Sequence, residues 1–454
     1  MNEIISQQRD YFSKNQTKDV NFRLQQLKIL KQLLNENETK IIKALKLDLH
    51  KPELEALTSE IILVRKEIEL AIRNIKNWTK PQNIRVPWQL WPVSGKIAPE
   101  PLGVVLIIGA WNYPFSLIVT PLIGAISSGN CAVLKPSEIA VNTSNLLAEI
   151  IPEYFDPAYI SVVEGGVETS QKLLTEKFDH IFFTGSSYIG KIVMEAAAKQ
   201  LIPVTLELGG KNPCIIDADI NLEYTARRII WGKFFNTGQT CIAPDYLLVN
   251  KQIKDKLIET LKKCLPEFFG EHPESSPDYG RIVNQKNFNR LINLLKTGKI
   301  IIGGENNPEQ LYIAPTFIDH VSLSDPIMQE EIFGPILPIL EYTDINEAIN
   351  LINSQPKPLA LYIFSQNQNL QQQITQATSS GAVGINDTLI HFSMPSLPFG
   401  GVGNSGMGKY HGKASFDTFT HYKSVYKNPF WLDIKLRYAP YKGKLELFKR
   451  IFKF

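Results

Sequence analysis

The stretch from Pro101 to Leu134 contains no charged residue and constrains the fold more than any other part of the chain. It is long enough to cross a bilayer as one helix, so a transmembrane segment is one hypothesis. Prolines and glycines, however, divide it into an apolar run at 103–108, a helical run at 115–129 and a second apolar run at 131–136. Apolar strands on either side of a helix are typical of a parallel sheet that is covered on both faces. We therefore favour a buried strand-helix-strand unit over a membrane span.

The alternation of strands and helices continues to residue 208. Further strand candidates lie at 160–165, 180–185 and 204–210, with helical stretches between them. This pattern predicts a doubly wound parallel α/β sheet, which binds ligands at the carboxyl ends of its strands. A second region of strands and helices begins near residue 209.

We divide the 454 residues into three parts, because a chain of this length exceeds one ordinary core. Residues 1–84, whose leucines recur at helical spacing, are assigned with residues 103–208 to the first domain. Residues 209–386 form the second domain. The proline- and tryptophan-rich segment 85–102 and the glycine-rich segment 387–454 are assigned as bridging segments.

The composition excludes several classes of protein. The chain is 44% hydrophobic and 20% charged with a formal charge of +3, which is ordinary for a globular protein and gives no basic surface for nucleic acid. Its four cysteines form no C-x-x-C pair and have no histidine at zinc-ligand spacing, so we expect free thiols and no metal site. The first twenty residues are polar where a signal peptide has an apolar core, so we expect a cytoplasmic protein.

The last fourteen residues, 441–454, place apolar side chains on one face of a helix, with lysines and an arginine beside them. A basic amphipathic helix of this kind lies on a membrane surface or docks on its own domain. We favour docking and keep peripheral membrane contact as the alternative.

The segment "DHIFFTGSSYIGK", 179–191, places a glycine turn between a strand and a helix, as phosphate-binding loops do. Gly185, Gly190 and the following lysine fit the G-x-x-x-x-G-K-[ST] loop of nucleotide hydrolases, but Ile192 replaces the hydroxyl residue that binds magnesium. The two glycines also fit the outer positions of the dinucleotide fingerprint, with Ser187 in place of its middle glycine. An ATPase is therefore disfavoured, and loose contact with a dinucleotide pyrophosphate is the remaining hypothesis.

Three residues are candidates for chemistry. Cys241 follows small and hydroxyl residues in "FFNTGQTCIAP" and is either a nucleophile or a buried structural thiol. Glu207 is the one carboxylate of an apolar strand, where burial would raise its pKa toward the range of a general base, unless it forms an ion pair. Asn112 ends another strand and is either a hydrogen-bond donor to an oxyanion or part of a turn. No histidine has a spacing that recommends it as the base for Cys241.

Seven motifs in a fixed order resemble the aldehyde dehydrogenase superfamily, specifically its class 3 branch of fatty and aromatic aldehyde dehydrogenases. The motifs are "GAWNYP", "LKPSE", "FFTGSSYIGK", "LELGGKNP", "NTGQTCIAPDY", "EEIFGP" and "LPFGGVGNSGMGKYHGKASFDTFTH". With the helical N-terminus, the resemblance covers nearly the whole chain. It implies a Rossmann-like doubly wound cofactor domain, a second α/β catalytic domain, and a small bridging and oligomerisation region.

The resemblance also implies catalytic roles. Cys241 matches the nucleophile that attacks the aldehyde, and Asn112 together with the Cys241 backbone N–H matches the oxyanion hole. Glu207 matches the base that activates water to hydrolyse the thioester to a carboxylate. The nearest alternative is an acylating enzyme of the same fold, which transfers the thioester to coenzyme A or phosphate. A non-catalytic relative is a further alternative that the intact motifs disfavour.

The same resemblance implies a nicotinamide cofactor. The positions that match cofactor-binding residues are Lys135, Glu138, Gly185, Ser186, Gly190, Glu331 and Phe333. Lys135 and Glu138 match contacts to the adenosine ribose, while Glu331 and Phe333 match contacts to the nicotinamide ribose and ring. Because Glu138 could accept a hydrogen bond from the ribose 2′-hydroxyl, we expect NAD, with NADP as the alternative.

We expect the substrate to enter through an apolar, aromatic funnel, which favours medium- or long-chain aliphatic aldehydes or aromatic ones. The residues assigned to this funnel are Tyr113, Trp231, Ile390, His391 and Phe392. Each of them could instead belong to the core. Class 3 enzymes are generally dimers, so we expect a homodimer.

Overall fold

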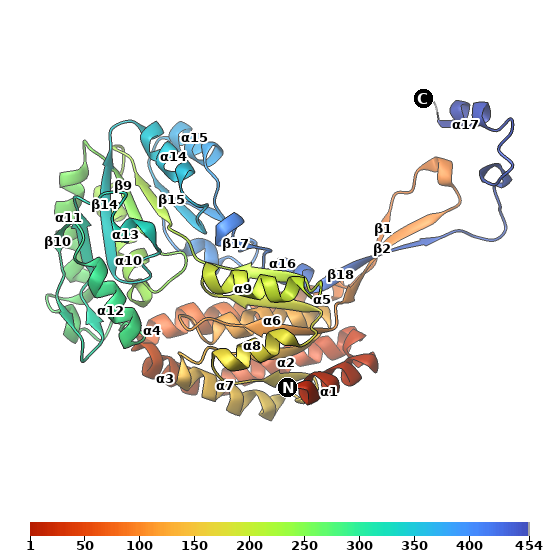
Figure 1. The fold of residues 1–454 in the computed structure, drawn as a ribbon, viewed down its shortest axis with the longest axis horizontal. Helices are drawn as coiled ribbons and strands as arrows, with labels where there is room; N and C mark the ends of the chain where they lie inside the picture. The colour runs from red at the N-terminus through yellow and green to blue at the C-terminus, as the bar shows by residue number, and fades with distance from the viewer. Residues whose placement is uncertain (453–454) are drawn as a thin grey trace.

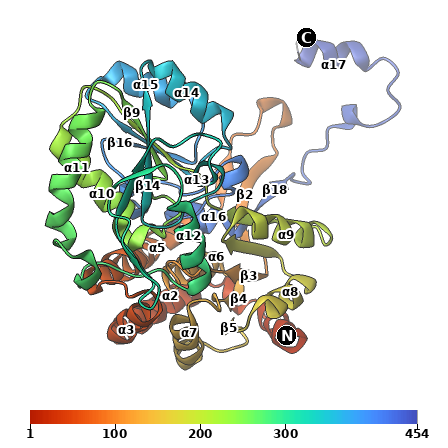
Figure 2. The same ribbon diagram turned by 60° about the vertical axis from the view of Figure 1, so that its left-hand side comes forward.

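The computed structural model describes residues 1–452, so the last two residues of the predicted tail helix lie outside the described residues. The chain forms two α/β domains side by side, and a long antiparallel arm extends from the first of them (Figures 1 and 2). The predicted α/β class is confirmed, and both domains contain sheets of parallel strands.

The first domain is built on a sheet with the order β17-β7-β6-β3-β4-β5. Its strands are β3 (Val104–Ile108), β4 (Cys131–Lys135), β5 (Ile160–Val162), β6 (His180–Thr184), β7 (Val204–Glu207) and the short β17 (Gly406–Met407). The central strand β3 pairs in parallel with β4 and β6, whereas β17 pairs antiparallel with β7 at the edge. The five parallel strands therefore have the Rossmann order. Successive strands are added on one side of β3 and then on its other side, so the topological switch point lies between β3 and β6.

The uncharged stretch forms the centre of this domain. Both β3 and β4 are buried along their whole length, and so is the connecting helix α6 (Ser116–Ser128). Gly129 ends that helix with φ +94°, a conformation that residues with a side chain rarely adopt. The predicted strand-helix-strand unit is confirmed. No helix within residues 1–452 is both long and apolar enough to cross a membrane.

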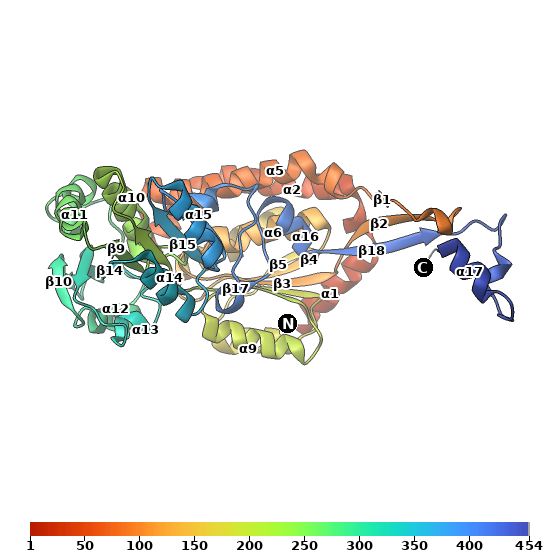
Figure 3. The same cartoon turned by 90° about the horizontal axis from the view of Figure 1, so that it is seen from above.

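Helices cover both faces of the sheet (Figure 3). Helices α1 (Asn2–Ser13), α8 (Val167–Thr175) and α9 (Ser187–Ala198) lie on one side. On the other side are α6, α7 (Val141–Tyr154) and α16 (Gly412–Thr418), covered by α2 (Val20–Glu36), α3 (Glu38–Leu49) and α5 (Ile62–Trp78). Between α3 and α5 the chain forms the short helix α4 (Glu53–Ala56) and a π-helical turn, η2 (Leu57–Ile61).

The second domain repeats the strand order of the first. Its sheet runs β10-β13-β14-β9-β8-β15-β16, and in chain order the five strands β14-β9-β8-β15-β16 again follow the pattern 3-2-1-4-5. The strands are β8 (Pro213–Ile216), β9 (Tyr246–Asn250), β10 (Lys299–Ile302), β13 (Thr316–Asp319), β14 (Ile336–Tyr342), β15 (Ala360–Phe364) and β16 (Ala382–Ile385), with a separate hairpin of β11 (Asn306–Asn307) and β12 (Tyr312–Ile313). The helices are α10 (Leu222–Phe234), α11 (Lys254–Phe269), α12 (Gln285–Leu294), α13 (Pro326–Gln329), α14 (Ile345–Ser354) and α15 (Gln368–Ala377).

The structure divides the two segments assigned as bridging. Strands β2 (Ser94–Pro101) and β18 (Thr420–Lys427) pair antiparallel and, with β1 (Gln82–Ile84), form the projecting arm. Helix α17 (Leu445–Phe452) lies near the tip of that arm and away from both domains (Figure 1). In contrast, β17 and α16 pack on the first domain.

Candidate active site

A cavity of about 1000 Å³ lies where the carboxyl ends of β6 and β7 face the second domain. Ligands of doubly wound sheets bind at this edge. Eleven of the residues selected from the sequence line the cavity: Asn112, Tyr113, Gly185, Ser186, Glu207, Trp231, Cys241, Glu331, Phe333, Ile390 and Phe392. The structure therefore brings together residues that are as much as 280 positions apart in the chain.

Cys241 follows a loop with an uncommon backbone. Three successive residues, Asn236, Thr237 and Gly238, have φ values of 50°, 55° and 73°, although the first two carry side chains. Such left-handed residues are costly and persist only where the surrounding structure holds them. The Cys241 side chain is partly exposed, whereas the other three cysteines are buried.

The electrostatic surroundings of the Cys241 thiol act in both directions. Burial raises the pKa of Cys241 well above its usual value, and the carboxylates of Glu331 and Glu207 raise it further. The backbone N–H groups of Cys241 and Ile242 oppose this by stabilising the thiolate. The cavity as a whole therefore disfavours negative charge on Cys241. The two backbone N–H groups are the donors that stabilise a thiolate there.

Asn112 lies just beyond the carboxyl end of β3 and contacts the loop that precedes Cys241. Its side-chain Nδ2 donates to the main-chain oxygen of Gln239 at 3.1 Å, which fixes the amide beside the nucleophile loop. The next residue, Tyr113, shares a hydrogen bond of 2.6 Å with the hydroxyl of Thr240. Asn112 and Tyr113 therefore contact Gln239 and Thr240, the two residues that precede Cys241.

Glu207 ends strand β7 inside the cavity wall. Among the residues that the structure describes, neither of its carboxylate oxygens has a hydrogen-bond partner. Burial raises the pKa of Glu207 well above its usual value, so the group holds a proton more tightly than an exposed glutamate does. Unpartnered and basic, this carboxylate is suited to taking a proton from a molecule that enters the cavity.

The turn after β6 presents the start of a helix to the cavity. Ser186 is the N-cap of α9, and its hydroxyl accepts from the backbone N–H of Ile189 at 3.4 Å. Gly185 leaves no room for a side chain, because a Cβ there would lie 2.6 Å from the ring of Phe183. The unpaired N–H groups of a helix N-terminus bind phosphate in doubly wound sheets.

Three of the residues assigned to the cofactor do not line the cavity. Gly190 is buried within α9, where a Cβ would lie 2.6 Å from Leu208, so it allows close helix–strand packing. Lys135 and Glu138, beyond the end of β4, form an ion pair of 3.2 Å with each other. The Lys135 side chain is buried, and Glu138 is exposed.

Glu331 and Phe333 reach the cavity from the second domain. The Glu331 carboxylate accepts from the backbone N–H of Gly210 at 3.3 Å, and burial raises its pKa to about 8. Phe333 has a positive φ of 49° and packs edge-on against Trp111 with ring centres 5.3 Å apart. Both side chains therefore line the same cavity as Cys241.

One residue assigned to the substrate funnel is in a different place. His391 does not line the cavity; its ring stacks on Phe399 at 5.8 Å instead. Burial lowers its pKa to about 4, and its Nε2 has no hydrogen-bond partner within the described part of the chain. The structure therefore does not place His391 in the funnel, since the other three residues of the turn at 390–393, Ile390, Phe392 and Ser393, line the cavity.

The sequence did not indicate several residues that line the cavity. Among them are Glu55 from α4 and the aromatic residues Phe399 and Tyr410. Glu55 lies in a charged helical segment that is typical of a protein surface, and Tyr410 lies in a glycine-rich loop. Only the packing of distant segments shows that these residues line the same cavity as Cys241. No group of three or more metal-binding side chains occurs among residues 1–452.

Known proteins share this chain's sequence and structure over almost its whole length. The aldehyde dehydrogenase family matches residues 1–425. The chain is 50% identical over 445 residues to 4,4'-diaponeurosporen-aldehyde dehydrogenase of Staphylococcus aureus (strain NCTC 8325 / PS 47), covering 98% of this chain and 97% of the relative. It is 46% identical to the dimeric NADP-preferring aldehyde dehydrogenase of Canis lupus familiaris, covering 98% and 99%. The solved structure of the substrate-bound state of Staphylococcus aureus AldH has a TM-score of 0.97 and 48% identity, and covers 99% of both chains. These similarities and the cavity show that the chain belongs to the aldehyde dehydrogenase family, in its class 3 branch, and is an aldehyde-oxidising enzyme.

Proposed function

We propose that this enzyme oxidises an apolar aldehyde to the carboxylate through a covalent intermediate on Cys241. The observation that carries this proposal is the meeting of Cys241, Asn112 and Glu207 at one cavity. A thiol with backbone donors, an amide donor and an unpartnered carboxylate are the three groups that this chemistry needs.

In the first half of the proposed reaction, the Cys241 thiolate attacks the carbonyl carbon and forms a thiohemiacetal. The Asn112 amide and the Cys241 backbone N–H stabilise the charge that develops on the carbonyl oxygen. The substrate carbon then loses a hydride and becomes a thioester. NAD or NADP, when bound, supplies the acceptor for that hydride.

In the second half, Glu207 takes a proton from a water molecule that attacks the thioester carbon. The C–S bond breaks, the carboxylate leaves and the Cys241 sulfur is free again. The raised pKa of Glu207 supports this role, because a stronger base removes a proton from water more readily.

The residues of the chain fit a dinucleotide. The parallel strands have the Rossmann order, the N-terminus of α9 faces the cavity, and Gly185 allows a close approach of the backbone. We propose that Gly185 and Ser186 lie beside the pyrophosphate, with Gly190 in the packing behind them. Lys135 and Glu138 hold the adenosine ribose, and Glu331 and Phe333 hold the nicotinamide ribose and ring. Relatives include a dehydrogenase whose name says NADP-preferring and a structure in complex with NAD+.

The cavity wall supports an apolar substrate. Beyond the catalytic residues, Tyr113, Trp231, Ile390 and Phe392 line it, together with Phe399. The 50% identical relative acts, by its name, on a diaponeurosporen aldehyde. We therefore propose a medium- or long-chain aliphatic, polyene or aromatic aldehyde as the substrate.

We also propose a homodimer in the cytoplasm, with the arm as its contact region. The arm carries exposed aromatic residues, including Trp88, Trp91 and Trp431, and a dimeric relative shares the length of the chain. Peripheral membrane contact through α17 is the alternative use of the tail, since this helix lies away from both domains (Figure 1).

The test is NADH or NADPH formation with a series of aldehydes of increasing chain length. We expect kcat/KM to rise with chain length and Cys241→Ala to abolish turnover. A preference for short, charged aldehydes would refute the apolar substrate. Turnover that survives Cys241→Ala would refute the covalent mechanism.

A further inference from the structure

A fully buried ion pair lies behind the proposed oxyanion hole. The Lys51 Nζ is 2.5 Å from the Glu60 Oε1, and both side chains are completely inaccessible to solvent. Lys51 lies between α3 and α4, and Glu60 lies in the π-helical turn η2. An isolated charge is costly to bury, so such a pair is retained only where its geometry is satisfied.

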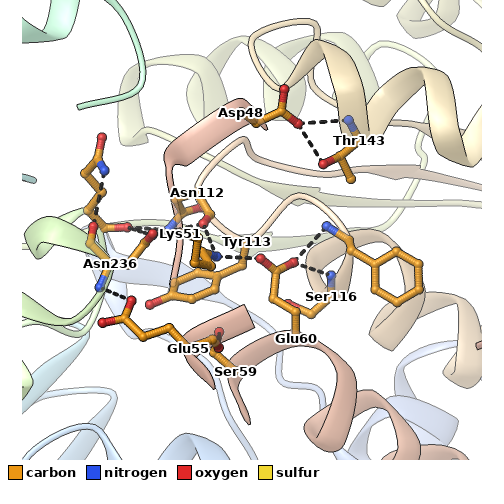
Figure 4. Close-up of polar contacts among 12 residues, drawn as sticks. Asp48, Lys51, Glu55, Ser59, Glu60, Asn112, Tyr113, Ser116, Thr143 and Asn236 are labelled. Atoms are coloured by element: carbon orange, nitrogen blue, oxygen red, sulfur yellow. Dashed lines mark hydrogen bonds and ion pairs between the residues drawn. The ribbon is translucent and has the colours of Figure 1, made fainter. Parts of the chain in front are cut away.

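The two partners fasten both ends of one short loop (Figure 4). Lys51 Nζ donates to the main-chain oxygen of Asn112 at 3.1 Å and lies 4.2 Å from the centre of the Tyr113 ring. Glu60 Oε2 accepts from the backbone N–H groups of Phe115 at 3.0 Å and of the next residue at 3.1 Å, where α6 begins. The loop from the end of β3 to the start of α6 is therefore fixed by one ion pair.

Asn112 is the point where this loop meets the nucleophile loop (Figure 4). Its main-chain oxygen accepts a second hydrogen bond, from the Asn236 Nδ2 at 3.0 Å. Its side-chain amide donates to Gln239 at 3.1 Å. Lys51 thus holds the main chain of Asn112, while the side-chain amide of the same residue donates to Gln239 and lines the cavity together with Cys241.

We propose that Lys51 is a positioning residue for aldehyde oxidation: by holding the Asn112 carbonyl, it orients the Asn112 amide toward the oxyanion that forms at Cys241. This inference rests on the proposed role of Asn112. It assigns to the pair a function beyond packing, because Lys51 contacts the main chain of Asn112 and Glu60 contacts the start of α6.

The test is a variant that removes both charges together. The variant is Lys51→Met with Glu60→Gln, which leaves no charge at either buried position. The side-chain carbonyl of the new glutamine can still accept from the backbone N–H groups at the start of α6. Replacing a buried ion pair by neutral groups in this way is often tolerated. A matched control is Lys254→Met with Asp319→Asn, which removes an ion pair of 2.8 Å whose residues do not line the cavity.

We expect the Lys51→Met/Glu60→Gln variant to lose about tenfold or more in kcat, which corresponds to about 1.4 kcal/mol in the barrier. Cofactor affinity, measured by fluorescence titration with NADH, is expected to change less than twofold. The control pair is expected to keep its kcat within twofold. If the variant does not fold, Lys51→Gln with Glu60→Gln is measured in its place. Its new amide at position 51 can still donate to the Asn112 carbonyl, so we expect kcat within about twofold of the wild type, and a tenfold loss would overturn the inference.

The decisive measurement is a double-mutant cycle with Asn112→Ala. This substitution removes the amide but keeps the carbonyl that Lys51 binds, so a merely structural effect of Lys51 would persist in it. We expect the loss from the Lys51→Met/Glu60→Gln change to shrink to less than twofold in the Asn112→Ala background. Equal losses in both backgrounds, or wild-type kcat in the variant while Asn112→Ala is impaired, would overturn only this inference. A fully active Asn112→Ala enzyme would overturn the proposed role of Asn112 as well.

Discussion

Replacement of Glu55 by glutamine is expected to stabilise the protein in a pH-dependent way. The Glu55 side chain is half-buried at the cavity wall, and its Oε2 accepts from the backbone N–H of Asn236 at 2.9 Å. Burial raises its pKa from 4.5 to about 7, although the Asn236 N–H and the charge of Lys51 partly oppose this. Glutamine keeps an oxygen that can accept the same hydrogen bond and has no charge to bury.

The size of the effect follows from the difference between the two pKa values. Because the pKa of Glu55 is higher in the folded state, its protonated form contributes its full stability below the unfolded pKa of 4.5. This contribution is lost as the pH rises through about 7 and the buried carboxyl group becomes charged. The difference corresponds to at most about 3 kcal/mol above pH 7. With an unfolding entropy of about 2 cal/mol/K per residue, this is roughly 3 °C in the unfolding temperature of a chain of 454 residues.

The assay is thermal unfolding of the wild type and of Glu55→Gln at pH 5 and at pH 8.5. We expect the variant to gain roughly 3 °C over the wild type at pH 8.5 and most of that gain to disappear at pH 5. Glu53→Gln, an exposed position in the same helix, is the matched control and is expected to show no such difference. An equal shift at both pH values would mean that the ionisation of Glu55 does not affect stability, and would refute the reasoning.

Two further substitutions test the site itself. Glu207→Gln is expected to lower steady-state kcat by about 10²- to 10⁴-fold, because hydrolysis of the thioester needs the base. The first turnover does not need it, so one equivalent of NADH should still form. Rapid-mixing absorbance measures both rates, and an unchanged steady-state rate would contradict the role of Glu207. Gly209→Ala would place a methyl group 2.1 Å from the Glu331 Oε2, so we expect the carboxylate to shift and kcat/KM to fall about tenfold or more. Gly166→Ala, where nothing lies within 4 Å of the added carbon, is the control for this substitution.

Much of the fold follows from local patterns in the sequence. The runs at 103–108 and 131–136 form β3 and β4 because a parallel sheet covered on both faces requires continuous apolar strands. Glycines at 109, 129 and 185 mark turns at the ends of strands and helices, which is why the strand ends, and with them Asn112 and Glu207, could be placed from the sequence.

The missed and misplaced residues share a physical cause. Lys51, between α3 and α4, and Glu55, in α4, lie in a charged stretch that resembles a solvated surface, and their partners Asn112 and Asn236 are 61 and 181 residues away in the chain. Helical periodicity indicates which face of a helix is apolar, but not which charged residue a distant part of the chain will bury. The funnel assignment of His391 has a related cause. Neighbouring residues of one turn point in different directions, and a sequence pattern does not show which of them reach the cavity.

Several positions that break local rules lie around Cys241. The left-handed residues Asn236 and Thr237 precede it, the unpartnered Glu207 faces it, and the buried Lys51 and Glu60 lie one shell behind. Each of these features costs free energy that ordinary packing would avoid, and each orients or tunes a group that contacts the cavity. The two sheets, in contrast, follow the usual rules of strand order and burial. Sequence patterns therefore predict the scaffold well and the supporting residues of the site poorly.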